Sequence, residues 1–257
     1  MRIASVGHTF FAATLIGLAL LGLIKGDLTA IWQPIPKAMP APAVLTYLCI
    51  FISLACGIGL LWQRTAALAA RVLLIFLLLW LLLWRVPAVL LSFTVDFWWS
   101  ASKTAAMTAG AWILYVWFAD DWDKRRFGFV AGDNGLRIAR VLYGLALIPF
   151  GIAHFMYLEP TTSLVPGWLP SPVFWAYFTG GAYIAAGVAM VTGVLAQLAA
   201  TLSAWETGLI TLLVWVPMAT NGHPTAFQWG EVEVSIALTA AAWVVAESYR
   251  RVQRLSS

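Results

Sequence analysis

The sequence predicts an all-α membrane protein with eight transmembrane helices, arranged as two repeated four-helix bundles. Three observations lead to this prediction: the composition, the spacing of the apolar segments and a match of the chain with itself. Of the 257 residues, 62% are hydrophobic and only 10% are charged, and the mean hydropathy is +0.87. A water-soluble domain of this length could not bury so much apolar surface, so we expect a bilayer around the chain.

Apolar segments long enough to cross a bilayer recur along the chain, and each is expected to form a helix. Such long segments exclude a transmembrane β-barrel, whose strands are only about ten residues long. We expect spans near residues 5–25, 44–62, 70–91, 102–119, 138–158, 173–193, 198–218 and 231–249.

The two halves of the chain match each other in sequence. Gly17 begins the tetrapeptide Gly-Leu-Ala-Leu, which recurs from Gly144, and after a three-residue insertion Pro42 aligns with Pro172. Prolines, glycines and aromatic residues then pair at the same separation, which indicates a tandem duplication. Since each repeat has an even number of spans, the repeats should be related by a pseudo-twofold axis along the membrane normal. The predicted parts are residues 1–119, a cytoplasmic linker at 120–137, and residues 138–257, which end in a basic tail.

Lysine and arginine residues gather in the loops on one side of the predicted membrane, which the positive-inside rule assigns to the cytoplasm. Both termini are therefore expected in the cytoplasm, and the expected location is a bacterial inner membrane. The same rule accounts for the net charge of +4, since the basic residues lie at helix ends rather than on one aromatic-studded face. We therefore expect no nucleic-acid partner.

Signatures of metal or thiol chemistry are missing from the sequence. Cys49 and Cys56 lie seven residues apart on one predicted helix, about 10 Å along its axis, too far for a disulfide. The three histidines, His8, His154 and His223, have no spacing suited to a metal or to haem ligation. We expect no metal site, and no catalysis by this chain alone.

Charged residues near the ends of spans need a partner or a use. Asp27 aligns with His154, and Lys103 aligns with Glu233. We expect Asp27 and Lys103 to form a structural polar pair that joins the first and fourth helices. His154 should then pair with Glu231 or Glu233 in the second half, either to fasten helices or to relay protons.

Glu206 differs from these residues because it lies about two turns inside a predicted span, where its counterpart Phe76 is apolar. At that depth a carboxyl group is either neutral and hydrogen-bonded to neighbours or part of a polar pocket.

The second half resembles the DoxX-like family of small four-helix membrane proteins over residues 137–250. The resemblance rests on the helix end Phe150-Gly-Ile-Ala-His154, the turn Val165-Pro-Gly-Trp-Leu-Pro170, the Thr179-Gly180 start and the late Gly230-Glu231-Val-Glu233. A weaker form, without the histidine and the glutamates, covers residues 12–118. Tyr183 stands where many members have an acidic residue, and we count it with Trp168 and Glu206 as candidates for lining a ligand pocket.

The resemblance implies an accessory or quinone-binding subunit of a membrane oxidoreductase, since the family is named for subunits of thiosulfate:quinone oxidoreductase. In that case His154, Glu231 and Glu233 are the candidate proton-handling residues, quinone is the cofactor, and the partners are the bilayer, a redox subunit and further copies of the chain. The alternative is a non-catalytic membrane scaffold or lipid-binding module. A transporter ranks below both, because a few charges at the rim do not form a polar path across the bilayer.

Overall fold

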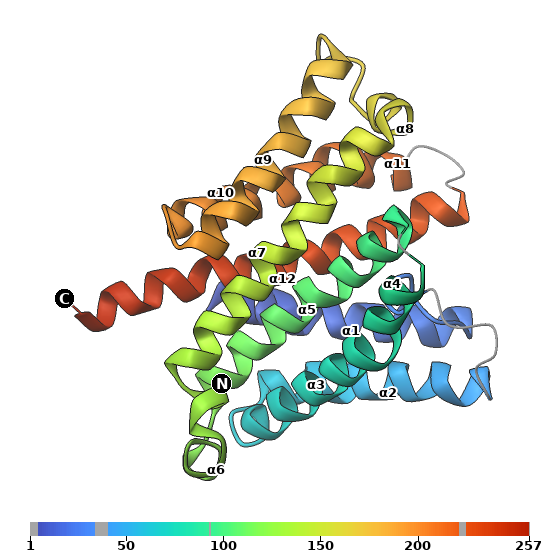
Figure 1. Ribbon diagram of the computed structural model, residues 1–257. Coiled ribbons are helices and arrows are strands. Elements are labelled where there is room, and N and C mark those ends of the chain that lie inside the picture. The colour runs from blue at the N-terminus through green and yellow to red at the C-terminus, as the bar shows by residue number, and fades with distance from the viewer. Residues whose placement is uncertain (1–4, 34–40, 93, 221–224, 257) are drawn as a thin grey trace.

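The structure is a computed structural model in which every regular element of the described chain is a helix (Figure 1). It describes residues 5–33, 41–92, 94–220 and 225–256, with residues 251–256 as backbone alone. Within these ranges, 7 helical segments are long and apolar enough to cross a bilayer. The prediction of a multi-pass membrane protein in a lipid bilayer is therefore confirmed.

The helices of the first half lie close to the predicted apolar segments. They are α1 (Val6–Lys25), α2 (Pro42–Leu61), α3 (Ala66–Trp80), the π-helical turn η1 (Leu81–Arg85), α4 (Val86–Leu91) and α5 (Val95–Phe118). Although α5 has 24 residues, it is not among the seven apolar segments. Its buried residues are mostly alanine, serine and threonine, because α5 faces other helices where small side chains allow close packing.

The helices of the second half repeat this order. They are α7 (Asp133–Met156), α8 (Leu158–Ser163), α9 (Pro172–Thr192), α10 (Ala196–Ile210), η2 (Thr211–Trp215), α11 (Val216–Thr220) and α12 (Ala226–Ser256). Equivalent elements of the two halves begin a constant number of residues apart. This holds for α2 and α9, for α3 and α10, for η1 and η2, and for α4 and α11. This separation is the one that aligns Pro42 with Pro172 in the sequence.

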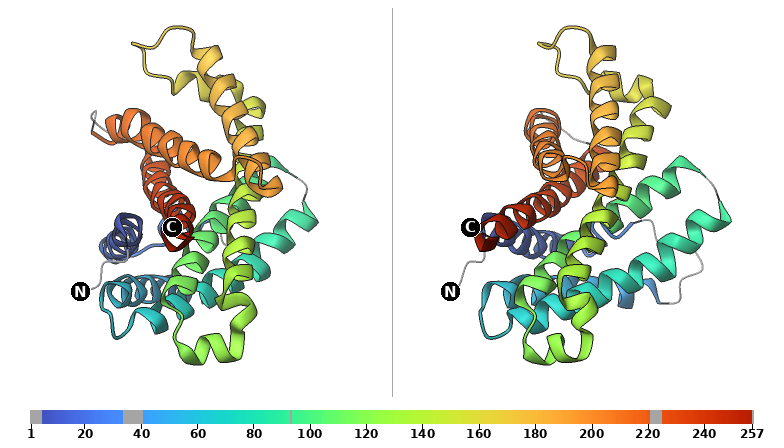
Figure 2. Two further views of the ribbon diagram at one scale, coloured as in Figure 1. Left: turned by 90° about the vertical axis from the view of Figure 1, so that its left-hand side faces the viewer. Right: turned by 60° about the vertical axis from the view of Figure 1, so that its left-hand side comes forward.

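The last long helix of each half lies at the centre of the molecule. There α5 and α12 pack against each other, α5 also packs against α3 and α7, and α12 also packs against α10 and α1 (Figures 1 and 2). Each central helix therefore contacts the first helix of the other half. The two halves interlock in this way and do not stand apart as two separate bundles.

The two π-helical turns have a local cause in the sequence. A proline stands two residues after the end of each turn: Pro87 after η1 and Pro217 after η2. Proline has no N–H to donate to the preceding turn, so the carbonyl ladder is interrupted there and the helix can widen by one residue. Arg85, at the end of η1, lies in the widened turn.

The predicted linker between the halves, residues 120–137, contains helix α6 (Asp121–Ala131). Its start is a capping box, in which the Asp120 carboxylate accepts from the backbone N–H of Asp123 at 2.9 Å and the Asp123 carboxylate accepts from the backbone N–H of Asp120 at 3.2 Å. The sequence signal for this cap is the acidic residue at both positions, which a purely compositional interpretation of the linker overlooks.

A buried carboxylate joins α6 to the first half. Asp123 is fully buried and accepts two hydrogen bonds from Arg71 of α3, at 2.8 and 2.9 Å, and one from the Tyr115 hydroxyl at 3.0 Å. Burial by itself would raise the pKa of Asp123, but the bonds from Arg71, the Asp120 backbone and Tyr115 outweigh it and hold the pKa below its usual value.

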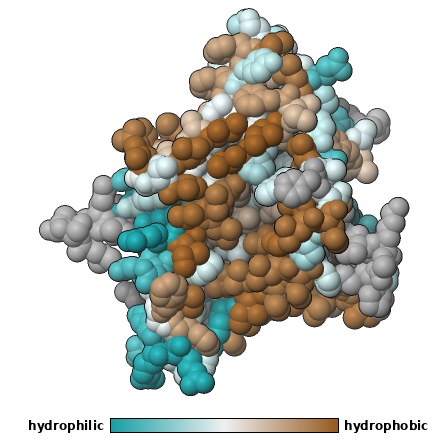
Figure 3. All heavy atoms as spheres, in the orientation of Figure 1, coloured by the Kyte–Doolittle hydropathy of each residue, from teal (hydrophilic) through white to brown (hydrophobic). Residues whose placement is uncertain are grey.

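The surface of the protein has apolar flanks and a hydrophilic end. Apolar side chains cover the flanks of the helices in Figure 3, whereas hydrophilic residues gather at the end of the molecule where α6 lies. Large apolar residues such as Leu82, Leu83 and Leu212 are more than half exposed, which is expected of side chains that face hydrocarbon.

Candidate functional site

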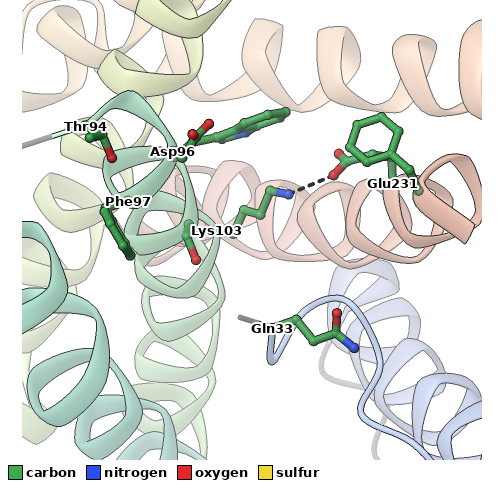
Figure 4. A pocket seen from close by; sticks show the side chains of 9 residues that line it. Gln33, Thr94, Asp96, Phe97, Lys103 and Glu231 are labelled. Carbon is green, nitrogen blue, oxygen red and sulfur yellow. Dashed lines mark hydrogen bonds and ion pairs between the residues drawn. The ribbon is translucent and has the colours of Figure 1, made fainter. Parts of the chain in front are cut away.

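A pocket opens between the first turns of α5 and α12, the two central helices, at the opposite end from α6 (Figures 1 and 4). Its volume is about 350 Å³, which is within the range of small-molecule sites. The pocket is lined by residues of α5, of α12, of the chain after α1 and of the chain just before α5: Gln33, Thr94, Asp96, Phe97, Trp99, Ser100, Lys103, Phe227 and Glu231.

An ion pair crosses this pocket from one half of the protein to the other. Lys103 of α5 donates to Glu231 Oε1 of α12 at 2.9 Å (Figure 4). The Lys103 ammonium also lies over the ring of Trp99, 4.4 Å from its centroid, in a cation–π contact. The lysine is therefore held between a carboxylate and an aromatic face, and both side chains of the ion pair are largely withdrawn from solvent.

A second ion pair lies two residues further along α12. Glu233, which is 4% exposed, is bonded to Lys25 at the end of α1 and accepts from the backbone N–H of Ala30 at 3.0 Å. Lys25 in turn lies over the ring of Trp229, 5.7 Å from its centroid. Glu231 and Glu233 thus each tie α12 to a helix of the first half.

Arg85 fixes the segment that follows α1 against the pocket. Its guanidinium is buried and donates to the backbone oxygens of Trp32 and Gln33, at 3.0 and 2.7 Å, and to the Thr104 hydroxyl at 3.2 Å. These bonds supply donors to the carbonyl groups of Trp32 and Gln33, which lie in a loop and have no helical partner. Gln33 consequently stands at the wall of the pocket (Figure 4).

The start of α5 supplies further polar groups. Asp96 accepts a hydrogen bond of 2.7 Å from the Tyr157 hydroxyl, which follows α7, and this bond raises the pKa of Tyr157 because the phenol proton is held by the carboxylate. The hydroxyl oxygen of Ser100 is buried and has no hydrogen-bond partner among the described residues. An unpaired buried hydroxyl is unfavourable unless a ligand or water bonds to it.

The structure pairs the predicted charged residues differently from our expectation. Lys103 is bonded to Glu231 and not to Asp27, whose Oδ1 accepts from the backbone N–H of Leu28 at 2.7 Å. The His154 ring bonds to the carbonyl oxygen of Phe150 one turn earlier, at 2.8 Å, rather than to a glutamate. The expected pairs within each half are wrong, because α5 and α12 contact the first helix of the opposite half.

The predicted pocket residues do not meet in one place either. Trp168 lies in the chain between α8 and α9, is 69% exposed and does not line the pocket. Tyr183 lies inside the second half beside His154, with ring centroids 5.6 Å apart. Glu206 is on α10 with its Oε1 buried. Of the sequence-predicted residues, the pocket contains Lys103 and Glu231, and Glu233 is next to it.

Among the residues of the site that sequence reasoning missed are Asp96, Trp99, Ser100 and Arg85. An arginine inside an apolar span is a costly residue, and this signal could have drawn attention to Arg85. Within the part of the chain that the structure describes, no group of three or more metal-ligating side chains comes together, and His223 lies outside that part.

Comparisons of the chain with protein-family models, with curated proteins and with solved structures found no match. The chemistry of the site is therefore argued from its own geometry. The pocket offers a charged donor, carboxylate and hydroxyl groups, and three flat rings at the ends of the two central helices. Such a site can bind a polar, planar head group whose remaining part lies in the lipid.

Proposed function

We propose that this protein binds the head group of a membrane quinone in the pocket between α5 and α12, as an accessory subunit of a membrane oxidoreductase. The observation that carries the proposal is the position of Lys103, held between Glu231 and the ring of Trp99 in a pocket of about 350 Å³. This position combines a charged hydrogen-bond donor with an aromatic surface at the membrane boundary.

The chemistry of a quinone matches these groups. Its flat ring carries two carbonyl oxygens, which accept hydrogen bonds, and its tail is soluble in hydrocarbon. Lys103 and the unpaired Ser100 hydroxyl are donors, and Phe97, Trp99 and Phe227 offer surfaces on which a planar ring can stack. Glu231 balances the charge of Lys103, so the site favours a neutral polar head group over an anion.

The wider architecture belongs to the same proposal. The protein would be a DoxX-like protein of the bacterial inner membrane with α5 as its eighth span, two tandem repeats and both termini in the cytoplasm. The matching starts of α2 and α9, and of η1 and η2, support the repeats. The basic residues of α6 lie at the end opposite the pocket (Figures 1 and 3), and by the positive-inside rule this favours a pocket at the outer face of the membrane.

The test is a binding titration of the purified protein with a short-chain ubiquinone analogue, followed by quenching of tryptophan fluorescence. Lys103→Met and Glu231→Gln should each raise the Kd about tenfold or more, since a hydrogen bond to a charged group contributes about 1.5–3 kcal/mol. Lys124→Met, in α6 at the other end of the molecule, should leave the Kd unchanged. An unsaturable signal, or equal Kd values for all four proteins, would overturn the proposal.

A second candidate function, a non-catalytic scaffold or lipid-binding module, is favoured by one observation. Both cations near the pocket already have an internal partner, Lys103 with Glu231 and Lys25 with Glu233. Their role could then be to hold the two halves together. In that case mass spectrometry of the purified protein would find retained phospholipid and no quinone, and the Lys103 and Glu231 variants would lower the melting temperature without changing the Kd for quinone.

A further inference from the structure

The interior of the second half contains polar side chains where the first half has apolar ones. In the alignment of the two halves that matches Pro42 with Pro172, Phe76 aligns with Glu206, and leucines align with Ser203, Thr207 and Thr211. The first half forms the same order of helices with these apolar residues. The polar residues of the second half are therefore not required to build the fold, although polar groups inside a membrane are unfavourable.

Glu206 is the only one of these residues that can carry a charge. It lies on α10, in the middle of a span that runs from Ala196 to Thr220. Its Oε1 atom is buried and has no hydrogen-bond partner among the described residues, and no ion pair involves it there. A charged carboxylate without a partner is strongly disfavoured in hydrocarbon, so the neutral acid is the stable form at this position.

Hydroxyl groups of two neighbouring helices reach α10 within one turn of Glu206, at Ser203 and Thr207. These hydroxyls belong to Tyr143 of α7 and Tyr183 of α9, which are 2% and 6% exposed. Their hydroxyls make long hydrogen bonds, of 3.5 Å to Ser203 and 3.3 Å to Thr207 on α10. Such long bonds are weak, which leaves both phenols able to bond to a further group.

Among the described side chains of the neighbouring helix α12, no charged group faces this cluster. Its Ser235 and Thr239 hydroxyls bond to Thr211, at 2.5 and 2.8 Å. Its glutamates are bonded elsewhere, Glu231 to Lys103, Glu233 to Lys25, and Glu247 to the backbone of Gly7, and Arg250 is exposed at its far end.

We propose that Glu206 is a proton-binding site within the membrane, in which the carboxyl group holds one proton and exchanges it with water through the hydroxyl groups of Tyr143, Tyr183 and Thr207. In the reaction the carboxylate takes up one proton to give the neutral acid, and no other bond is formed or broken. This site lies away from the pocket between α5 and α12, so it does not depend on the proposed quinone binding.

The first test is labelling of the purified, detergent-solubilised protein with dicyclohexylcarbodiimide, a hydrophobic reagent that adds to protonated carboxyl groups in apolar surroundings. Mass spectrometry of the α10 peptide should find the adduct on Glu206 at neutral pH, and its yield should fall as the pH is raised. The carboxylates of Glu231 and Glu233, which are in ion pairs, provide the internal comparison and should react much less. Recovery of the α10 peptide without adduct at every pH would overturn the proposal.

The second test measures the proton itself. Infrared difference spectra between neutral and high pH should show loss of the carbonyl band of a protonated carboxylic acid, and Glu206→Gln should lack this band. Glutamine has the shape of the neutral acid and is expected to fold. If the variant does not fold, the spectra and the labelling of the natural protein decide alone. Identical difference spectra for the two proteins, or a natural protein without the band, would contradict the proposal.

Discussion

Asp123→Asn is predicted to destabilise the protein by about 2–3 kcal/mol at neutral pH. The Asp123 carboxylate is fully buried and accepts two bonds from Arg71 and one from Tyr115. Loss of one member of a fully buried ion pair costs about 3–5 kcal/mol, but the Arg71 side chain is 24% exposed, and water can solvate it in the variant. Asparagine keeps the shape of the side chain and the cap of α6, so the change isolates the charge.

The assay is thermal unfolding in detergent, monitored by circular dichroism. A loss of this size should lower the Tm by about 5–10 °C in a protein of this length. Asp121→Asn, which removes an exposed carboxylate from the same helix, is the matched control and should shift the Tm by less than about 1–2 °C.

The effect should also depend on pH in a defined direction. Because the pKa of Asp123 is lower in the folded protein than in the unfolded chain, its carboxylate stabilises the fold fully above the unfolded-state pKa of about 4. This stabilisation disappears as the pH falls through the folded-state pKa. The Tm difference between the natural protein and the variant should thus be constant from neutral pH to about pH 5 and shrink below about pH 4. Equal Tm values at neutral pH would refute the reasoning.

Three further changes test contacts between helices. Charge reversal at Lys103 alone or at Glu231 alone should lower the free energy of unfolding by about 1–2 kcal/mol, and exchange of both residues should restore most of it, as measured by thermal unfolding. Absence of this rescue would show that Lys103 pairs with another carboxylate. Gly151→Ala should destabilise by about 3 kcal/mol, because its Cβ would lie 2.3 Å from a backbone oxygen of α9, and Gly181→Ala, which has open space, should not. Glu247→Ala should lower stability by about 1 kcal/mol, since both carboxylate oxygens accept from the backbone N–H at the start of α1; an unchanged Tm would show that this cap contributes nothing.

The positions of the helices could be predicted from the sequence with small errors. The starts of α5 and α12 were placed several residues too late, at 102 and 231 instead of 95 and 226. Both helices begin with polar and charged residues, among them Asp96, Lys103 and Glu231. Hydropathy locates the part of a helix that can lie in lipid, whereas the hydrogen-bonded helix continues beyond that part.

The candidate site could be predicted only in part. Lys103, Glu231 and Glu233 were identified because charged residues in apolar surroundings require a partner. Their partners were assigned wrongly, since the expectation paired the first and fourth helices of the same half. Trp99 and Ser100 carry no signal in the sequence, because a tryptophan at the membrane boundary and a serine in a helix are ordinary there.

The sequence by itself determined that this is a multi-pass membrane protein, where its helices lie and which of their ends carry charge. These properties depend on hydropathy and local order along the chain. Only the tertiary structure decided that α5 packs against α12, so that Lys103 meets Glu231, and that α12 packs against α1, so that Glu233 meets Lys25. The physical reason is that helices of similar apolar character can pack in several orders, and the choice depends on the close fit of small side chains on α5 and α12.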